Sequence, residues 1–289
     1  MVGWDPATYL DFAAERARPF HDLLARVGSA DPEAMDPEAT GRQAVRQVAD
    51  LGCGPGGLTA SLADRWPRAR VLGVDSSPEM IDRTAAYARP GRVDFELADL
   101  RYWQPAEPVD VIITNATLQW VPGHLDLLTR WVGSALKPGG WLALQVPGNL
   151  SDPLHTLLRE LSSSPRWADR LGDAERVRAE VPDPAGYVEV LAGAGCRVDA
   201  WETTYLHILD PDGRFGPDAV LAWARGTALR PVLDLLRDKG SGDAFIDEYA
   251  ERLRAAYPRR PWGTPLPFRR VFAVAHTQSG SDPAPGGNP

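Results

Sequence analysis

A glycine-rich turn placed directly after a short strand constrains the fold of this 289-residue chain more than any other feature. Residues 48–57 read Val-Ala-Asp-Leu-Gly-Cys-Gly-Pro-Gly-Gly, so an apolar strand carrying Asp50 runs straight into the glycines. Glycine is needed where a backbone turns sharply off a strand and lets a ligand approach, because a Cβ would obstruct both. Gly52, Gly54 and Gly57 also fit the G-x-G-x-x-G spacing of dinucleotide-binding folds. The turn therefore predicts a nucleotide-like ligand at the end of a parallel strand.

Acidic residues close three successive predicted strands and narrow the choice of ligand. Asp50 precedes the glycines, Asp75 ends the strand 70–75, and Asp99 follows the strand 93–98. An acid about 20 residues past the glycines holds ribose hydroxyls in nucleotide sites. Asp50 would repel a pyrophosphate but attract the ammonium of a methionyl group. A single Asp at a strand end also serves as a helix cap or turn residue, but three in one βαβαβ pattern favour S-adenosylmethionine.

Position gives each acid a role in this predicted cofactor site. We expect Asp75 to bind the ribose, Asp99 to bind the adenine amino group, and Asp50 to lie near the methionine end. Ser76 or Ser77 is expected to cap the helix that follows. The predicted cofactor-binding residues are Asp50, Gly52, Gly54, Gly56, Asp75, Ser76, Met80, Asp99, Leu100 and Asn115.

Charge and terminal sequence indicate a protein that acts on a small molecule. The net charge of −8 argues against a nucleic-acid substrate, which requires a basic face. Residues 1–5 lack the basic and apolar blocks of a signal peptide, and no apolar run is long enough to cross a bilayer. We therefore expect a cytoplasmic protein with a small-molecule substrate and without nucleic-acid or membrane partners. The oligomeric state stays open, with a monomer as one option.

Cysteines and histidines do not form a metal-binding pattern. Cys53 and Cys196 make neither a disulfide framework nor a ligand cluster, so both are interpreted as structural thiols. None of the five histidines forms an H-x-x-x-H or H-E-x-x-H pair that would place two ligands on one helix face. The sequence predicts no metal.

Strand and helix patterns alternate between residues 45 and 146, which is typical of a parallel, doubly wound sheet. Residues 137–140, Lys-Pro-Gly-Gly, predict a tight turn into the fifth strand. The fold class is thus α/β, a doubly wound, Rossmann-like, seven-stranded sheet with a helical lid. The predicted strands lie near 45–51, 70–75, 93–98, 109–114, 141–146, 197–206 and 269–275.

The remaining segments are expected to surround this sheet. Proline at positions 6 and 19 predicts two N-terminal helices, one to about Arg18 and one from Pro19 to Val27. A helical lid would exclude water from a substrate and set specificity. The predicted organisation is cap helices at 1–28, a cofactor-binding core at 44–150, 195–210 and 266–277, a helical lid or substrate region at 151–194 and 211–265, and a disordered tail at 278–289.

The end of the fourth strand carries a further indication. Residues 115–120, Asn-Ala-Thr-Leu-Gln-Trp, occupy a ligand position of an open α/β sheet. They lack the two prolines that follow Asn or Asp there in methyltransferases acting on base or amide nitrogen. The chain is thus not expected to methylate such a nitrogen.

In these motifs the chain resembles the class I S-adenosylmethionine-dependent methyltransferases and, within them, the trans-aconitate 2-methyltransferase family. Residues 50–56 and 73–78 carry the superfamily resemblance, which covers nearly the whole chain. It departs at 29–42, at 162–182 and in the tail. The narrower resemblance lies in Trp4–Pro6 with Tyr9, in Ala14–Pro19, Asn115–Trp120, Trp201–His207, Gly226–Pro231 and Pro267–Phe272.

The resemblance implies methyl transfer to a carboxylate of trans-aconitate, giving a monomethyl ester and S-adenosylhomocysteine. A carboxylate with a pKa of about 4 is already ionised near neutrality, so no general base is needed and no catalytic residue is assigned. Orientation of the reactants can supply roughly 7–11 kcal/mol of the acceleration.

A polyacid substrate must be held by cations and hydroxyls, with arginine favoured for its planar fork. Each arginine also has the ordinary interpretation of a solvated surface charge. Two alternative functions stay open: an O-methyltransferase of another small carboxylic or hydroxyl compound, and an S-adenosylmethionine-binding module without catalysis. The candidate substrate-binding residues are Arg230, Arg269, His207, Tyr205, Trp120, Tyr9 and Arg16.

Overall fold

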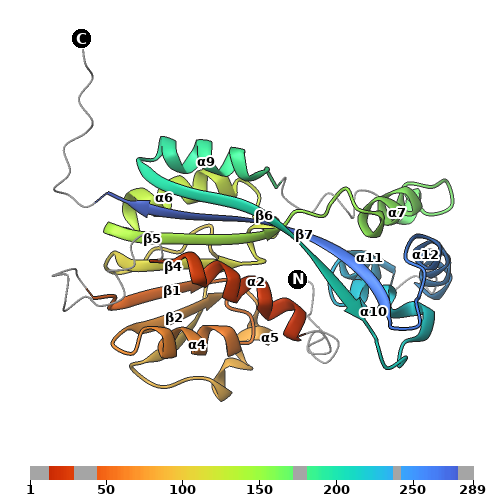
Figure 1. The fold of residues 1–289 in the computed structure, drawn as a ribbon, viewed down its shortest axis with the longest axis horizontal. Helices are drawn as coiled ribbons and strands as arrows, with labels where there is room; N and C mark the ends of the chain where they lie inside the picture. The colour runs from red at the N-terminus through yellow and green to blue at the C-terminus, as the bar shows by residue number, and fades with distance from the viewer. Residues whose placement is uncertain (1–12, 29–43, 172–180, 237–241, 279–289) are drawn as a thin grey trace, which may run out of the picture. The chain divides into compact units, whose positions relative to one another are not determined.

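Seven strands form one mixed sheet in this computed structural model, which describes residues 13–28, 44–171, 181–236 and 242–278 (Figure 1). The strands are β1 (Gln47–Leu51), β2 (Arg70–Asp75), β3 (Val93–Leu97), β4 (Val109–Asn115), β5 (Leu136–Pro147), β6 (Cys196–Leu209) and β7 (Thr264–Thr277). Their order across the sheet is β3-β2-β1-β4-β5-β7-β6. The arrow of β7 points opposite to that of β5 in Figure 1. The predicted α/β fold with a seven-stranded sheet is confirmed.

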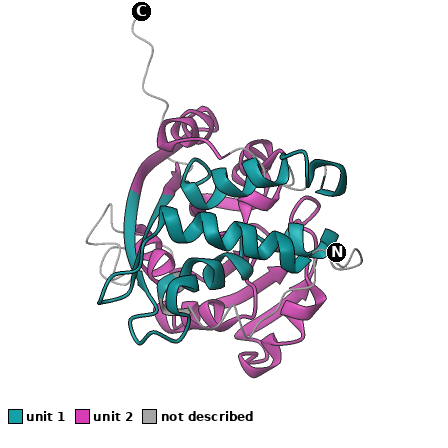
Figure 2. Ribbon diagram, turned by 90° about the vertical axis from the view of Figure 1, so that its right-hand side faces the viewer, with its two compact units in different colours: residues 1–16, 147–179, 203–270 teal, residues 17–146, 180–202, 271–289 magenta. Residues whose placement is uncertain are grey.

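The chain divides into two units, which Figure 2 colours separately. Unit 1 consists of residues 1–16, 147–179 and 203–270, and unit 2 of residues 17–146, 180–202 and 271–289. Each unit has its own hydrophobic cluster.

Parallel pairing at the centre of the sheet in unit 2 brings the carboxyl ends of β1, β2 and β4 together. β1 pairs in parallel with β2 on one side and with β4 on the other, with Asp50 opposite Gly73 and Ile113. Residues 48–51 are all buried, as expected for a central parallel strand covered on both faces. Parallel pairing places the carboxyl ends of β1, β2 and β4 along the same edge.

Helices of unit 2 cover this sheet. The unit contains α2 (Ala13–Arg26, whose first residues fall in the range of unit 1), α4 (Gly57–Arg65), α5 (Pro78–Ile81), η2 (Thr84–Ala86), η3 (Leu118–Trp120), α6 (His124–Ser134) and α9 (Pro184–Gly193). α4 and α5 contact β2 and β3, whereas α6 and α9 contact each other. The apolar side chains that these two helices bury in the hydrophobic cluster of unit 2 include Leu128 and Trp131 of α6 and Tyr187 and Leu191 of α9.

The N-terminal helix corrects one prediction. α2 continues through Pro19, where the sequence predicted the end of one helix and the start of another. A proline inside a helix removes one hydrogen bond and costs about 3 kcal/mol. Phe20, Leu23 and Val27 are buried, and that burial favours the continuous helix. The predicted part before residue 13 lies outside the described residues.

The position of the Lys-Pro-Gly-Gly stretch, residues 137–140, corrects a second prediction. It lies inside β5 rather than before it, because Leu136 already pairs with Val109 on β4. The next pair is Val111 with Trp141, so the extra residues of β5 form an irregularity in the ladder. Lys137 binds the Asp110 carboxylate at 2.9 Å across this irregularity.

Unit 1 is mainly helical apart from its parts of β6 and β7. Its helices are α7 (Pro153–Ser162), α8 (Ala168–Leu171), η5 (Gly216–Asp218), α10 (Ala219–Arg225), α11 (Arg230–Leu236) and α12 (Gly242–Ala256). Two tyrosine hydroxyls of unit 1 hold the peptide of Leu154: Tyr249 donates to its carbonyl at 2.5 Å, and Tyr257 accepts from its N–H at 3.0 Å. Whether this unit acts as a lid stays a prediction.

In the part of the chain that the structure describes, no helix is both long enough and apolar enough to cross a membrane.

Candidate functional site

The glycine loop, residues 52–57, leaves β1 with backbone angles that require glycine. Gly52 has φ +86°, and a Cβ on it would lie 2.0 Å from the Thr117 hydroxyl oxygen. Gly54 has φ +54°, but a Cβ there would meet no atom within 4 Å. Gly52 therefore serves close packing against the loop after β4, whereas Gly54 faces open space. That space is what a ligand approaching the backbone needs.

Asp75, at the end of β2, joins the glycine loop to the next helix. Its Oδ2 accepts a hydrogen bond from the Gly54 N–H at 2.9 Å, and its Oδ1 accepts one from the Ser77 N–H at 2.9 Å. A carboxylate has about four acceptor positions, so both oxygens retain capacity for hydroxyl donors. The predicted ribose-binding acid thus lies beside the open backbone of Gly54.

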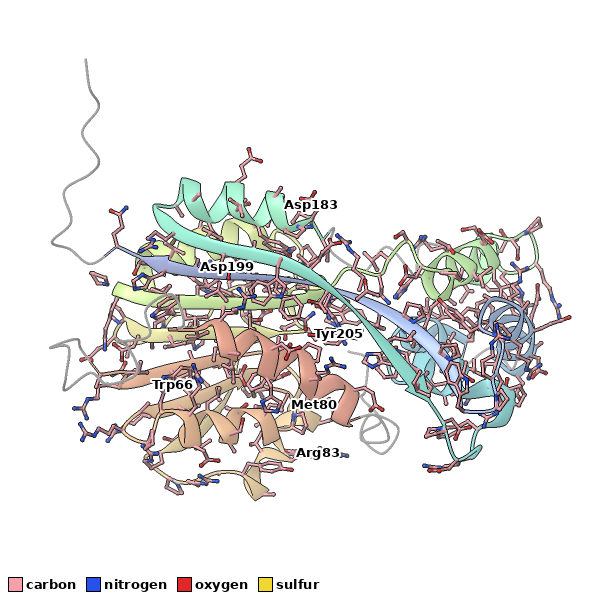
Figure 3. The ribbon with its side chains drawn as sticks, in the orientation of Figure 1. Trp66, Met80, Arg83, Asp183, Asp199 and Tyr205 are labelled. Carbon is pink, nitrogen blue, oxygen red and sulfur yellow. The ribbon has the colours of Figure 1, made fainter. Side chains whose placement is uncertain are left out.

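The helix after β2, α5, shows which of the two neighbouring serines is its cap. Ser77 is the cap of α5, because its side chain accepts from the Met80 N–H, and Pro78 follows at the first helical position. Ser76 is exposed, and its predicted contact with the cofactor stays a prediction. Met80 is buried on α5 (Figure 3).

Asp50 is a buried acid beneath the loop. Its Oδ2 accepts a hydrogen bond of 2.6 Å from the Thr59 hydroxyl of α4. Burial raises the pKa of Asp50 to about 7; the Thr59 hydrogen bond opposes this shift and the charge of Asp75 adds to it. Burial, followed by the charges of Asp50 and Asp75, also raises the pKa of the Cys53 thiol. The thiol is therefore protonated near neutrality, and its structural role stays a prediction.

Asp99 is already paired within the protein. Its carboxylate receives Nη2 of Arg101 at 2.6 Å and Nε at 3.0 Å. These hydrogen bonds lower the pKa of Asp99. Arg130 donates to the Arg101 carbonyl at 2.6 Å, which fixes this loop, and Leu100 is buried within it. Binding of the adenine amino group by Asp99 stays a prediction.

Within the described chain, the end of β4 and the loop after it hold two side-chain acceptors that lack hydrogen-bond partners. Ala116 has φ +55°, a strained angle for a residue with a Cβ. Gln119 donates to the Ala116 carbonyl at 2.6 Å and so fixes this turn. Among the described residues, the buried Asn115 Oδ1 and Gln119 Oε1 accept no hydrogen bond. Such acceptors fit a ligand that carries N–H or O–H donors.

Sequence reasoning missed Thr59 and Gln119. Gln119 lies within the Asn-Ala-Thr-Leu-Gln-Trp stretch, so its position was available as a signal. For Thr59 the signal was weaker: a hydroxyl on the helix that directly follows the glycine loop.

Two candidate substrate residues lie together on β6 in unit 1. Tyr205 (Figure 3) and His207 are buried two positions apart, with ring centroids 6.1 Å apart. The His207 ring stacks on Trp223 of α10 at 5.2 Å. These residues form an aromatic cluster with one imidazole.

On β7, neighbouring arginines differ in surroundings. Arg269 is half-buried, and its Nη1 donates to the Gly148 carbonyl at 3.0 Å. Arg270 is buried, with its guanidinium carbon 4.3 Å from the centre of the Phe268 ring. The sequence singled out only the first of these cations.

The other candidate substrate residues are less defined. Tyr9 lies outside the described residues, as do the side chains of Arg16 on α2 and Arg230 at the start of α11. Trp120 is half-buried in η3 of unit 2. Within the described ranges, no three His, Cys, Asp or Glu side chains gather as metal ligands would. The absence of a metal stays a prediction.

Comparison with known proteins adds sequence relatives of high similarity. A family model described as a methyltransferase domain matches residues 48–140. The chain is 54% identical to a trans-aconitate 2-methyltransferase of Streptomyces coelicolor, over 96% of this chain and 88% of that protein. It is 48% identical to the protein of the same name from Rhodococcus jostii, over 95% of this chain and all of that protein.

Solved structures support the fold. A chain of the complex between the Haloferax volcanii Trm112 methyltransferase activator and a methyltransferase aligns with a TM-score of 0.52 at 17% identity, over 96% of this chain and 97% of that one. The YcgJ protein of Bacillus subtilis aligns with a TM-score of 0.51 at 12% identity, over 82% of this chain and 94% of that one.

Proposed function

The chain belongs to the trans-aconitate 2-methyltransferase family, and we propose that it transfers the methyl group of S-adenosylmethionine to one carboxylate of trans-aconitate. The products are the monomethyl ester and S-adenosylhomocysteine. The observation that carries the proposal is 54% identity over 96% of the chain to a relative of that name. The chain is thus a methyltransferase that uses S-adenosylmethionine as cofactor.

The residues at the strand ends of unit 2 fit this cofactor. Gly54 offers a backbone surface without a side chain, and Asp75 beside it can accept hydroxyl donors. Asn115 Oδ1 is a buried acceptor suited to an amino or hydroxyl group. When bound, the cofactor supplies an electrophilic methyl group. We assign its ribose to Asp75, its adenine to the Asp99 and Leu100 loop, and its methionyl end to the side of Asp50.

The chemistry asks little of the protein beyond orientation. The acceptor carboxylate, with a pKa of about 4, is ionised near neutrality and needs no base to remove a proton. The raised pKa of the Cys53 thiol argues against a covalent intermediate on that residue. We therefore propose that binding and orientation carry the acceleration, with no general base.

Binding of the acid is assigned to cationic and polar side chains. Arg269 is held by Gly148 in one orientation, which suits bidentate contact with a carboxylate. Tyr205 and His207 contribute a hydroxyl and an imidazole from β6. The remaining proposed contacts are Trp120, Arg230, Arg16 and Tyr9.

Methyl transfer from radiolabelled S-adenosylmethionine to a panel of acids tests the proposal. The panel contains trans-aconitate, cis-aconitate, citrate, isocitrate and a monocarboxylate, and the product is tested for a base-labile ester. We expect a strong preference for trans-aconitate. Transfer to a different acid or to a hydroxyl would replace the substrate, and cofactor binding without any transfer would support a non-catalytic binding module.

A further inference from the structure

Thr59 and Asp50 form a buried pair that no role assigned so far explains. Thr59 is 0% exposed and Asp50 is 3% exposed. The hydroxyl of Thr59 donates a hydrogen bond of 2.6 Å to Asp50 Oδ2. The pair joins the first turn of α4 to the end of β1, directly beneath the glycine loop.

This bond is not the default for a helical hydroxyl. Serine and threonine in helices commonly donate to a backbone carbonyl three or four residues earlier. Ser61, on the same helix, does so with the Leu58 carbonyl at 2.6 Å, and Thr84 does so with the Ile81 carbonyl at 2.7 Å. Thr59 instead donates to a carboxylate nine residues away in sequence.

The surroundings of Asp50 oppose its charge apart from this bond. Opposite it, β2 and β4 contribute Gly73 and Ile113, which carry no charge. From the end of β2, Asp75 adds a second negative charge, and no cation is among the groups that shift the pKa of Asp50 in the described chain. The Cys53 thiol stays protonated. Among the described residues, the Thr59 hydroxyl is thus the side-chain group that stabilises the anion.

We propose that Thr59 is a positioning residue for cofactor selection: its hydrogen bond favours the charged form of Asp50, and charged Asp50 makes the site prefer S-adenosylmethionine over S-adenosylhomocysteine. The inference rests on the proposed function. The cofactor carries a sulfonium charge that the product lacks, so a buried anion favours the cofactor. Because burial holds the pKa of Asp50 at about 7, small changes in its hydrogen bonding alter its charge near neutrality.

The test compares Thr59→Val, which keeps the shape but removes the hydroxyl, with Thr59→Ser, which restores the hydroxyl. Calorimetry gives the affinity for each ligand between pH 5.5 and 9. For the wild type we expect the affinity for S-adenosylmethionine to rise with pH and to level off above about pH 7. Thr59→Val should shift the midpoint of this rise in affinity upward by about one pH unit, which corresponds to about a tenfold change in the protonation equilibrium of Asp50. It should also lower the preference for cofactor over product severalfold near pH 7.

Two controls separate this role from a structural one. Thr59→Ser should restore the midpoint and the preference, and Thr84→Val, a matched buried threonine without a carboxylate partner, should leave both unchanged. If Thr59→Val weakens both ligands equally at an unchanged midpoint, Thr59 is a structural residue and the proposal is wrong.

A measurement without ligand or variant guards against a protein that does not fold. NMR of the carboxyl carbon of Asp50 in the cofactor-free wild type should show a titration close to pH 7. A titration in the ordinary range of Asp, or a cofactor preference independent of pH, would overturn the inference. A protein with this pH dependence but no transfer to trans-aconitate would overturn only the proposed function, and one that binds neither ligand would overturn both.

Discussion

The glycine loop of unit 2 and the β6–β7 strand pair of unit 1 differ in how their polar side chains are arranged. In the loop, Asp75 accepts hydrogen bonds from the backbone of Gly54 and Ser77, residues within one turn of a strand end. In the strand pair, Arg269 binds the Gly148 carbonyl while the neighbouring Arg270 is buried on an aromatic ring. A backbone-built site follows local sequence, whereas a side-chain-built site depends on which face each strand residue takes.

Strand alternation gives the reason. Successive side chains of a strand point to opposite faces, so one residue of difference changes the surroundings completely. Between Thr264 and Arg270 of β7 every second residue is buried, Phe268 and Arg270 among them, as Tyr205 and His207 are on β6. Arg269 lies between two of these buried positions, so its side chain points to the opposite face of the strand.

The largest effect is expected at the backbone-built site, from Asp75→Ala. The change leaves two backbone N–H groups without their charged acceptor and removes a ribose contact. Hydrogen bonds to charged groups contribute about 1.5–3 kcal/mol each, so we expect roughly 100-fold weaker binding of S-adenosylmethionine by calorimetry. The control is Asp94→Ala, an exposed acid on the neighbouring strand β3. A similar loss in both variants would contradict the assignment of Asp75.

An intermediate effect is expected from the arginine pair of β7. Arg269→Ala should raise the KM for trans-aconitate about tenfold with little change in cofactor affinity, because the charged contact with the acid is lost. Arg270→Met should lower the melting temperature more than Arg269→Ala does, because its side chain packs on Phe268. Steady-state kinetics and calorimetry measure both. The opposite pattern would exchange the roles of the two residues.

A pH-dependent change in stability is expected from Asp50. Burial raises the pKa of its carboxyl from the ordinary 3.8 to about 7. Between these values the folded chain binds a proton that the unfolded chain has released, so the stability from this residue is lost as the pH rises. The melting temperature of the cofactor-free wild type should therefore fall from pH 5 to pH 8 more steeply than that of Asp50→Asn. Equal slopes would show that Asp50 does not titrate in this range.

The smallest effect is expected from Arg26→Ala, at the surface of unit 2. Arg26 binds the Asp199 carboxylate at 2.8 Å and lies 4.8 Å above the Trp201 ring. About half of each charged side chain is exposed, so solvent weakens the ion pair. We expect a loss of at most about 1 kcal/mol in urea unfolding. A loss of several kcal/mol would mean that α2 stabilises β6 far more than these contacts account for.

Predictions from sequence succeeded where local rules act alone. The seven strands and the cap at Ser77 follow from patterns a few residues long. Predictions failed where packing outweighs local preference. The helix α2 continues through Pro19, and the Lys-Pro-Gly-Gly stretch lies within β5 because the strand already pairs with β4 before it.

The sequence by itself determined the fold class, the family and the residues that build the glycine loop. Those properties depend on spacing along the chain, on glycine's freedom at positive φ and on acids at strand ends. Only the tertiary structure showed that Thr59 donates to Asp50, and that Arg270 is buried while Arg269 binds Gly148. Each of these depends on the approach of distant segments or on the face that a side chain takes, and neither is encoded in short-range spacing.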